Sequence, residues 1–247
     1  MPKDRAQPDA PPADPVELRA TLTDPSDLGL RRLAEAVRGN RPAWLALLGD
    51  PGLAREALAA VLRSGVLEGQ VPERRAEMVV EDLISALGAA RHAEARPTLI
   101  RIFVAGQSAW QRAGDALLRL GDPESLAVVA GTLEGAENAK LRLALRAVFE
   151  ADAARAFDRL SPRFAEPSER AGLVLYESLV ALMRDLTDDG KAHWGPSRRW
   201  FERDPRWLEL CERWGALPPA EERARWGSQH AQGIVEVAAW LRKRPLP

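Results

Sequence analysis

The sequence predicts an all-α fold, a right-handed α-solenoid of about four to five helical hairpins closed by a Trp-rich C-terminal helical cap. Three observations predict this class. A helical hairpin recurs along the chain, apolar residues repeat with the period of a helix, and no stretch alternates strictly between apolar and polar residues over several positions. Stacked hairpins usually form surfaces that hold other molecules and only rarely form catalytic sites.

The clearest hairpin spans residues 111–133. Its two helices are marked by apolar residues at positions i, i+3, i+4 and i+7: Ala113, Ala116, Leu117 and Leu120, followed by Leu126, Val129, Ala130 and Leu133. Between them, Gly121 suits the left-handed position after a helix end, Asp122 can cap the next helix, and Pro123 fits the first helical position. The sequence therefore predicts two helices joined by a minimal turn.

The same pattern predicts further helices on both sides of this hairpin. Gly88 lies 33 residues before Gly121 and is expected to end the first helix of the preceding copy. The apolar residues of the predicted helices are Leu30, Leu33 and Val37; Leu58, Val61 and Leu62, after a start at Asp50-Pro51; Val80, Leu83, Ile84 and Leu87; Leu99, Ile100 and Phe103; Leu141, Leu145, Val148 and Phe149; Phe157, Leu160 and Phe164, after a cap at Asp152; and Leu175, Leu179, Leu182 and Leu186.

The turn at residues 116–124, Ala-Leu-Leu-Arg-Leu-Gly-Asp-Pro-Glu, resembles the junction of bacterial HEAT-type repeats, a family that stacks such hairpins into a curved solenoid. The signature patterns of tetratricopeptide and ankyrin repeats are absent. Farther on, Leu186-Thr187-Asp188-Asp189-Gly190, Trp194 and Arg199-Trp200-Phe201 resemble the Leu-Thr-Gly segment and tryptophan pair that close some of these proteins. Asp188 stands where glycine is usual, and Phe201 replaces the second tryptophan.

Composition indicates how the chain is organised. With 247 residues, of which 46% are hydrophobic, it can bury a substantial core. We expect a disordered Pro-rich arm at residues 1–15, the HEAT-like array at 16–189 and a Trp- and Arg-rich cap at 190–247. No segment approaches the ~18 uninterrupted apolar residues of a membrane span, so the expected location is cytoplasmic.

The predicted cap is basic and rich in aromatic residues. Residues 190–247 carry 11 Lys and Arg against 7 Asp and Glu, and they contain six of the eight tryptophans. Trp207, Leu210, Cys211 and Trp214 fall on one helical face after a start at Asp204-Pro205, which favours a buried role over a binding platform. Four arginines are the predicted contact to an acidic protein partner: Arg198, Arg199, Arg203 and Arg206.

Catalytic patterns are not found in the sequence. The three histidines, His92, His193 and His230, are far apart, and neither they nor the single cysteine belong to a metal-ligand spacing. The sequence contains no nucleophile elbow, phosphate loop or dinucleotide fingerprint after a predicted strand. We therefore predict no catalytic residue, no metal and no cofactor.

Two functions remain open. The first is a non-enzymatic protein–protein interaction module or scaffold, such as an immunity or regulatory protein. The alternative is a HEAT-like alkyl-base DNA glycosylase or other nucleic-acid-binding protein, with Trp110 and Asp115 as the nearest candidates. Five residues apart on a helix, these two side chains would be rotated by roughly 140° and would not share a face. The acidic balance before residue 190 also disfavours a groove that follows phosphates.

Overall fold

The computed structural model describes residues 46, 48–63, 74–106, 109–136, 138–186, 192–194 and 204–243. In these ranges the chain is helical apart from turns and two three-residue strands, which confirms the all-α class. No helix among them is both long enough and apolar enough to cross a membrane. The predicted arm at residues 1–15 and the helix predicted around Leu30, Leu33 and Val37 lie outside the described residues.

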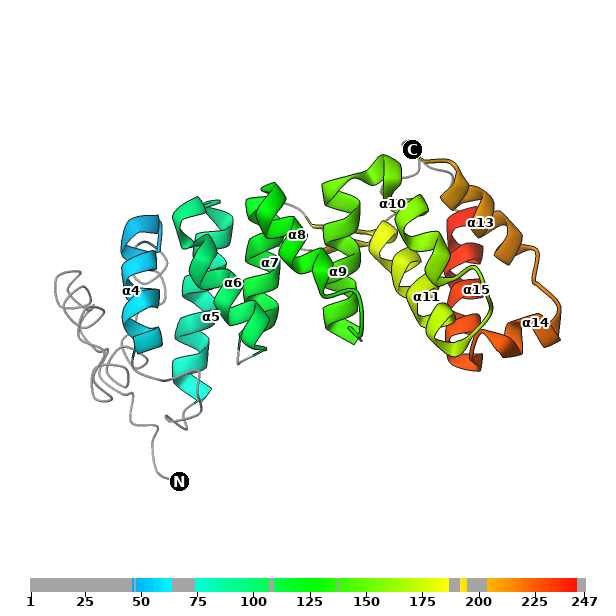
Figure 1. The fold of residues 1–247 in the computed structure, drawn as a ribbon, viewed down its shortest axis with the longest axis horizontal. Coiled ribbons are helices and arrows are strands. Elements are labelled where there is room, and N and C mark those ends of the chain that lie inside the picture. Colours follow the sequence, from blue (N-terminus) through cyan, green and yellow to red (C-terminus); the bar gives the residue numbers. More distant parts are fainter. Residues whose placement is uncertain are drawn as a thin grey trace, which may run out of the picture. The chain divides into compact units, whose positions relative to one another are not determined.

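The chain divides into two compact units, an N-terminal unit that ends at Leu120 and a C-terminal unit that begins at Gly121. Figure 1 shows the order of their elements along the chain. The N-terminal unit contains α4 (Pro51–Arg63), α5 (Arg74–Ala89), the short 3-10 helix η2 (Ala93–Ala95), α6 (Arg96–Ala105) and α7 (Trp110–Leu120). The C-terminal unit contains α8 (Pro123–Gly131), α9 (Asn138–Ala151), α10 (Ala153–Leu160), η3 (Ser161–Arg163), α11 (Glu169–Met183), β1 (Arg184–Leu186), β2 (Ala192–Trp194), α13 (Arg206–Gly215), α14 (Ala220–Arg225) and α15 (Ser228–Lys243).

The N-terminal unit is built around α5 and α7. Helix α5 packs against α4 and α7, and α7 also packs against α6. The predicted start of α4 is confirmed, because the Asp50 carboxylate accepts hydrogen bonds from the backbone N–H groups of Gly52 and Leu53 at 3.0 and 3.2 Å. Most of the predicted apolar positions are buried here: Leu58, Val80, Leu83, Ile84, Leu87, Leu99, Phe103, Ala113, Ala116 and Leu117.

Gly88 has a different role from the one predicted. Helix α5 continues past it to Ala89, and the left-handed residue after the helix is Arg91, with φ +49°. A Cβ atom at Gly88 would lie 2.8 Å from Cα and Cβ of Ala116. This glycine therefore allows α5 and α7 to approach closely, a contact that the spacing to Gly121 did not indicate.

The turn that opens the C-terminal unit has the predicted geometry. Gly121 has φ +67°, which favours glycine because a Cβ atom is strained in that region. The Asp122 carboxylate accepts hydrogen bonds from the backbone N–H groups of Glu124 and Ser125, both at 3.1 Å, and from the Ser125 hydroxyl at 2.6 Å. Pro123 is the first residue of α8. The local sequence alone therefore specifies the start of α8.

Helices α9, α11 and α15 connect the other helices of the C-terminal unit. Helix α9 packs against α8, α10 and α11, and α15 packs against α11, α13 and α14 (Figure 1). The predicted cap of α10 is confirmed, since the Asp152 carboxylate accepts from the backbone N–H of Arg155 at 3.3 Å. Helix α11 approaches the start of α15 so closely that a Cβ atom at Gly172 would lie 1.9 Å from the carbonyl oxygen of Trp226.

One predicted helix ends earlier than expected. The helix drawn through Leu186 stops at Met183, and residues 184–186 form β1, which pairs antiparallel with β2. The register places Arg184 opposite Trp194, Asp185 opposite His193 and Leu186 opposite Ala192. Strands of three residues are too short to display an alternating pattern over several positions, so no periodic signal predicts them. Residues 187–191 lie outside the described part of the chain.

Candidate functional site

The tryptophans of α13 belong to the core, as predicted. Trp207 and Trp214 are each 1% exposed, and Cys211 between them is also buried. The Trp207 ring lies 5.0 Å from the ring of Phe157, 5.5 Å from that of Phe149 and 6.1 Å from that of Phe164, measured between centroids. Such offset and edge-on aromatic contacts are favourable beyond the area that they bury. The reading of Trp207 and Trp214 as an exposed binding platform is therefore wrong.

The buried position of Cys211 also fixes its chemistry. Burial, together with the smaller effect of the nearby Glu212 carboxylate, raises the pKa of the Cys211 thiol to about 12. Because the thiolate is the reactive form of cysteine, the neutral thiol behaves as a small apolar group. This confirms the role predicted from its place on the apolar face.

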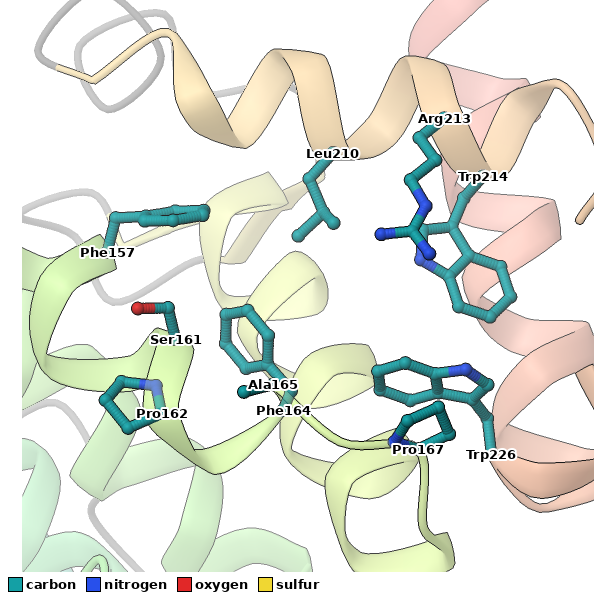
Figure 2. A pocket seen from close by; sticks show the side chains of 10 residues that line it. All are labelled: Phe157, Ser161, Pro162, Phe164, Ala165, Pro167, Leu210, Arg213, Trp214 and Trp226. Carbon is teal, nitrogen blue, oxygen red and sulfur yellow. The ribbon is translucent and has the colours of Figure 1, made fainter. Parts of the chain in front are cut away.

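An open cleft of about 530 Å³ lies beside this aromatic core, between the α10–α11 segment and α13 (Figure 2). Its lining comes from α10, η3, the loop before α11, α13 and the residue that follows α14. The lining residues are Phe157, Ser161, Pro162, Phe164, Ala165, Pro167, Leu210, Arg213, Trp214 and Trp226. All of them belong to the C-terminal unit, and most are apolar.

Four aromatic rings form the floor of the cleft; those of Phe164, Trp214 and Trp226 are buried, and that of Phe157 is half-buried. Trp214 and Trp226 meet edge to face, with ring centroids 5.5 Å apart and planes at 84°. Phe157 and Phe164 form a second edge-on pair at 6.1 Å. In Figure 2 Phe157 lies toward one end of the cleft, Phe164 near its middle, and Trp214 and Trp226 toward the other end. The surface that a ligand can reach is supplied mainly by the more exposed lining residues: Phe157, Ser161, Pro162, Ala165, Pro167, Leu210 and Arg213.

Arg213 is the one charged residue among the described residues that line this cleft. Its guanidinium group donates a hydrogen bond to the Glu222 carboxylate of α14 at 2.6 Å. The Arg213 side chain is 63% exposed and that of Glu222 is 29% exposed, so water screens this ion pair. Figure 2 shows the Arg213 side chain extending from α13 toward the cleft, with its guanidinium group beside Trp214.

Arg206, one of the four predicted partner contacts, is held by two carboxylates of the same unit. It donates to Asp204 at 2.7 to 3.2 Å through several atoms and to Asp158 at 2.5 Å. Its guanidinium carbon lies 4.6 Å from the centroid of the Phe157 ring. The hydrogen bonds that Arg206 donates to Asp204 and Asp158 raise the pKa of Arg206, and the bond to Asp158 lowers the pKa of that carboxyl group. Arg206 therefore borders the cleft by covering the ring of Phe157.

The other three predicted contacts, Arg198, Arg199 and Arg203, lie outside the described residues, as does most of the segment that resembles the HEAT-protein terminus. Sequence reasoning missed Arg213, although a signal was available. Arg206, Leu210 and Arg213 are spaced i, i+4 and i+7, which places them on one face of α13 next to the buried stripe. The residues contributed by α10, η3 and Trp226 had no such signal, because they come from distant parts of the sequence.

A buried carboxylate also lies between α9 and α11, away from the cleft lining. The Glu177 side chain is 3% exposed and accepts two hydrogen bonds from Arg142, at 2.6 and 2.9 Å. These bonds raise the pKa of Arg142. The two-bond geometry and the burial of Glu177 are typical of a charge pair that ties two helices together.

Trp110 and Asp115, the residues considered for the glycosylase alternative, both belong to α7. Trp110 begins this helix and packs against Phe103 at 6.3 Å between ring centroids, and Asp115 follows five residues later. Among the described residues, no group of three His, Cys, Asp or Glu side chains is placed to hold a metal ion.

The chain matches no protein-family model, no curated protein and no solved structure.

Proposed function

We propose that this chain is a non-enzymatic protein-binding module of HEAT-repeat type, in which the cleft of the C-terminal unit receives a segment of a partner protein. In this proposal about four to five hairpins continue as a right-handed solenoid. The observation that carries the proposal is an open apolar cleft on a helical framework, with a single charged residue among the described residues of its lining. Sites of this composition bind ligands through apolar contact and use few polar groups for orientation.

The packing beneath the cleft supports a binding role. Three of the floor rings, Phe164, Trp214 and Trp226, are buried, so their positions are set by the core and need not be ordered when a ligand binds. A preformed surface reduces the entropy lost on association. Apolar side chains of a partner that cover Phe157, Leu210 and Pro167 would gain roughly 25 cal/mol for each Å² removed from water.

The four predicted arginines belong to the same proposal. Arg206 adjoins the cleft through Phe157, and Arg198, Arg199 and Arg203 precede it by a few residues in the sequence. We retain them as the proposed contact to acidic groups of the partner. An immunity or regulatory protein is the kind of molecule that would use such a surface.

Selection of peptides from a phage-displayed random library on the full chain tests the proposed function. Ala165→Trp fills the cleft at an exposed lining position, and Ala154→Trp places the same side chain on an exposed position of α10 outside the lining. We expect the selected peptides to bind the wild type and the Ala154→Trp variant, and not to bind the Ala165→Trp variant. Failure to select any peptide, or peptides that bind Ala165→Trp equally well, would refute the cleft as a protein-binding site.

Small-angle scattering of the full chain tests the proposed solenoid. A compact globule of this length has a radius of gyration of about 18 Å. A stacked array of hairpins should give a clearly larger value, and a value near 18 Å would refute the solenoid.

A further inference from the structure

We propose that the cleft recognises a carboxylate carried next to a bulky apolar group, with Arg213 as the residue that binds the carboxylate. Glu222 then acts as an internal carboxylate that a ligand replaces. The inference rests on the proposed function of the cleft as a protein-binding site. If the cleft binds a protein, the ligand is an acidic residue of the partner beside a large apolar side chain.

The position of Arg213 supports this assignment. It shares one face of α13 with Leu210 and Arg206, and among the described residues that line the cleft it is the only charged one. Arg206 is already held by the buried Asp204 and by Asp158, whereas Arg213 has a single carboxylate at hydrogen-bond distance among the described residues. A guanidinium group stays charged at every physiological pH and can bind a carboxylate through two parallel hydrogen bonds. Arg213 is therefore the cation that a ligand in the cleft can reach.

Glu222 is held only weakly in its place beside Arg213. It belongs to α14, a helix of six residues, none of which is buried. The ion pair joins two partly exposed side chains, and exposed ion pairs contribute little to stability. Exchange of the Glu222 carboxylate for that of a ligand therefore costs little, and Glu222 can turn into water.

The surroundings of Arg213 define the rest of the ligand. An apolar group can lie along Leu210, Phe157 and Pro167 while an attached carboxylate reaches the guanidinium group at the edge. A ligand cation would meet repulsion from Arg213 at the same edge. The cleft therefore selects against positive charge and in favour of negative charge.

Fluorine NMR titration with two small probes tests the inference on the full chain. The probes are 4-fluorophenylacetate and 4-fluorophenylacetamide, which have the same ring and nearly the same shape but differ in charge. We expect the carboxylate to bind the wild type at least fivefold more tightly than the amide. In Arg213→Gln this preference should vanish, while in Glu222→Gln the affinity for the carboxylate should rise, by up to about fivefold, because the competing charge is removed.

A matched control separates this effect from a general loss of positive charge. Arg155 is 84% exposed, lies on α10 of the same unit and is not part of the cleft lining. Arg155→Gln should keep the full preference for the carboxylate, and circular dichroism should show that each variant is folded. The inference would be overturned if the two probes bound equally well to the wild type and also to Glu222→Gln. It would also be overturned if Arg155→Gln lost as much of the preference for the carboxylate probe as Arg213→Gln does.

The peptide selection distinguishes this inference from the proposed function. Selected peptides that depend on the cleft but lack Asp and Glu would overturn the carboxylate assignment and leave the protein-binding function standing. A preference for the carboxylate probe without any peptide binder would support the assignment and refute the protein-binding function.

Discussion

Alanine at Gly172 is expected to destabilise the C-terminal unit, although alanine is the better helix former. Gly172 lies within α11, where the exchange would favour an unconstrained helix by about 1 kcal/mol. In the folded chain, however, the added Cβ atom would lie 1.9 Å from the carbonyl oxygen of Trp226 and 2.9 Å from its carbonyl carbon. Both are backbone atoms, which cannot rotate away as the end of a flexible side chain does.

The size of the effect follows from this contact. Relief of the clash requires α11 and the turn at Trp226 to separate by more than about 1 Å, which loosens packed side chains on both sides. Overpacking of this kind costs about 1–3 kcal/mol and occasionally more, and a clash with backbone belongs at the upper end. After the gain in helix propensity, we expect a net loss of about 2 kcal/mol, equivalent to a melting temperature lower by about 4–8 °C for a chain of this size.

Urea and thermal unfolding followed by circular dichroism measure this loss. Gly131→Ala is the matched control, because Gly131 ends α8 and a Cβ atom there meets nothing within 4 Å. It should leave the free energy of unfolding unchanged or raise it by up to about 1 kcal/mol. If Gly172→Ala were as stable as the wild type, the close approach of α11 to Trp226 would be refuted, and with it the position of one wall of the cleft.

Three further predictions concern single residues. Trp207→Ala should lower the free energy of unfolding by about 3–5 kcal/mol, the usual result of emptying a large aromatic site, and a normal urea transition would contradict its place in the core. Asp122→Ala should cost about 0.5–2 kcal/mol without loss of far-ultraviolet helix signal, whereas Asp122→Asn should keep most of the stability because the amide oxygen still accepts. Ellman's reagent should modify Cys211 only in the unfolded chain, and labelling of the folded chain at the rate of a free thiol would contradict its burial. Since the pKa of this thiol is about 12 in the folded chain and ~8.5 when unfolded, its contribution to stability is present below about pH 8.5 and is lost as the pH rises toward 12.

Features set by local chemistry could be predicted from the sequence. The turn at Gly121 and the caps at Asp50, Asp122 and Asp152 depend on residues within a few positions of one another, and all are present in the structure. The buried stripe of α13 was also predictable, because helical spacing alone places Trp207 and its neighbours on one face. In each case the residues that reveal the feature in the sequence are the same residues whose chemistry produces it in the structure.

Features that depend on contacts between distant segments could not be predicted. Gly88 resembles a turn glycine by its spacing, yet its role depends on Ala116 in another helix. Phe157 and Trp226 line the same cleft although they lie 69 residues apart in the sequence. Helical periodicity predicts which face of a helix is buried, but it does not predict which other segment covers that face. The pairing of β1 with β2 is likewise too short to leave a periodic pattern.

Arg206 and Arg213 show why residue type alone did not identify the binding cation. The sequence presents both as arginines on the same face of α13, and the prediction chose Arg206 together with its neighbours upstream. In the structure Arg206 donates to the buried Asp204 and to Asp158 and lies against Phe157, so its removal would leave a buried carboxylate without its cation. Arg213 has an exposed partner on a helix with no buried residue, so its carboxylate can be exchanged at little cost. Both arginines carry the same charge, but they differ in how strongly their present carboxylate partners hold them. Arg206 is therefore a structural residue at the border of the cleft, and Arg213 is the residue that can bind a ligand there.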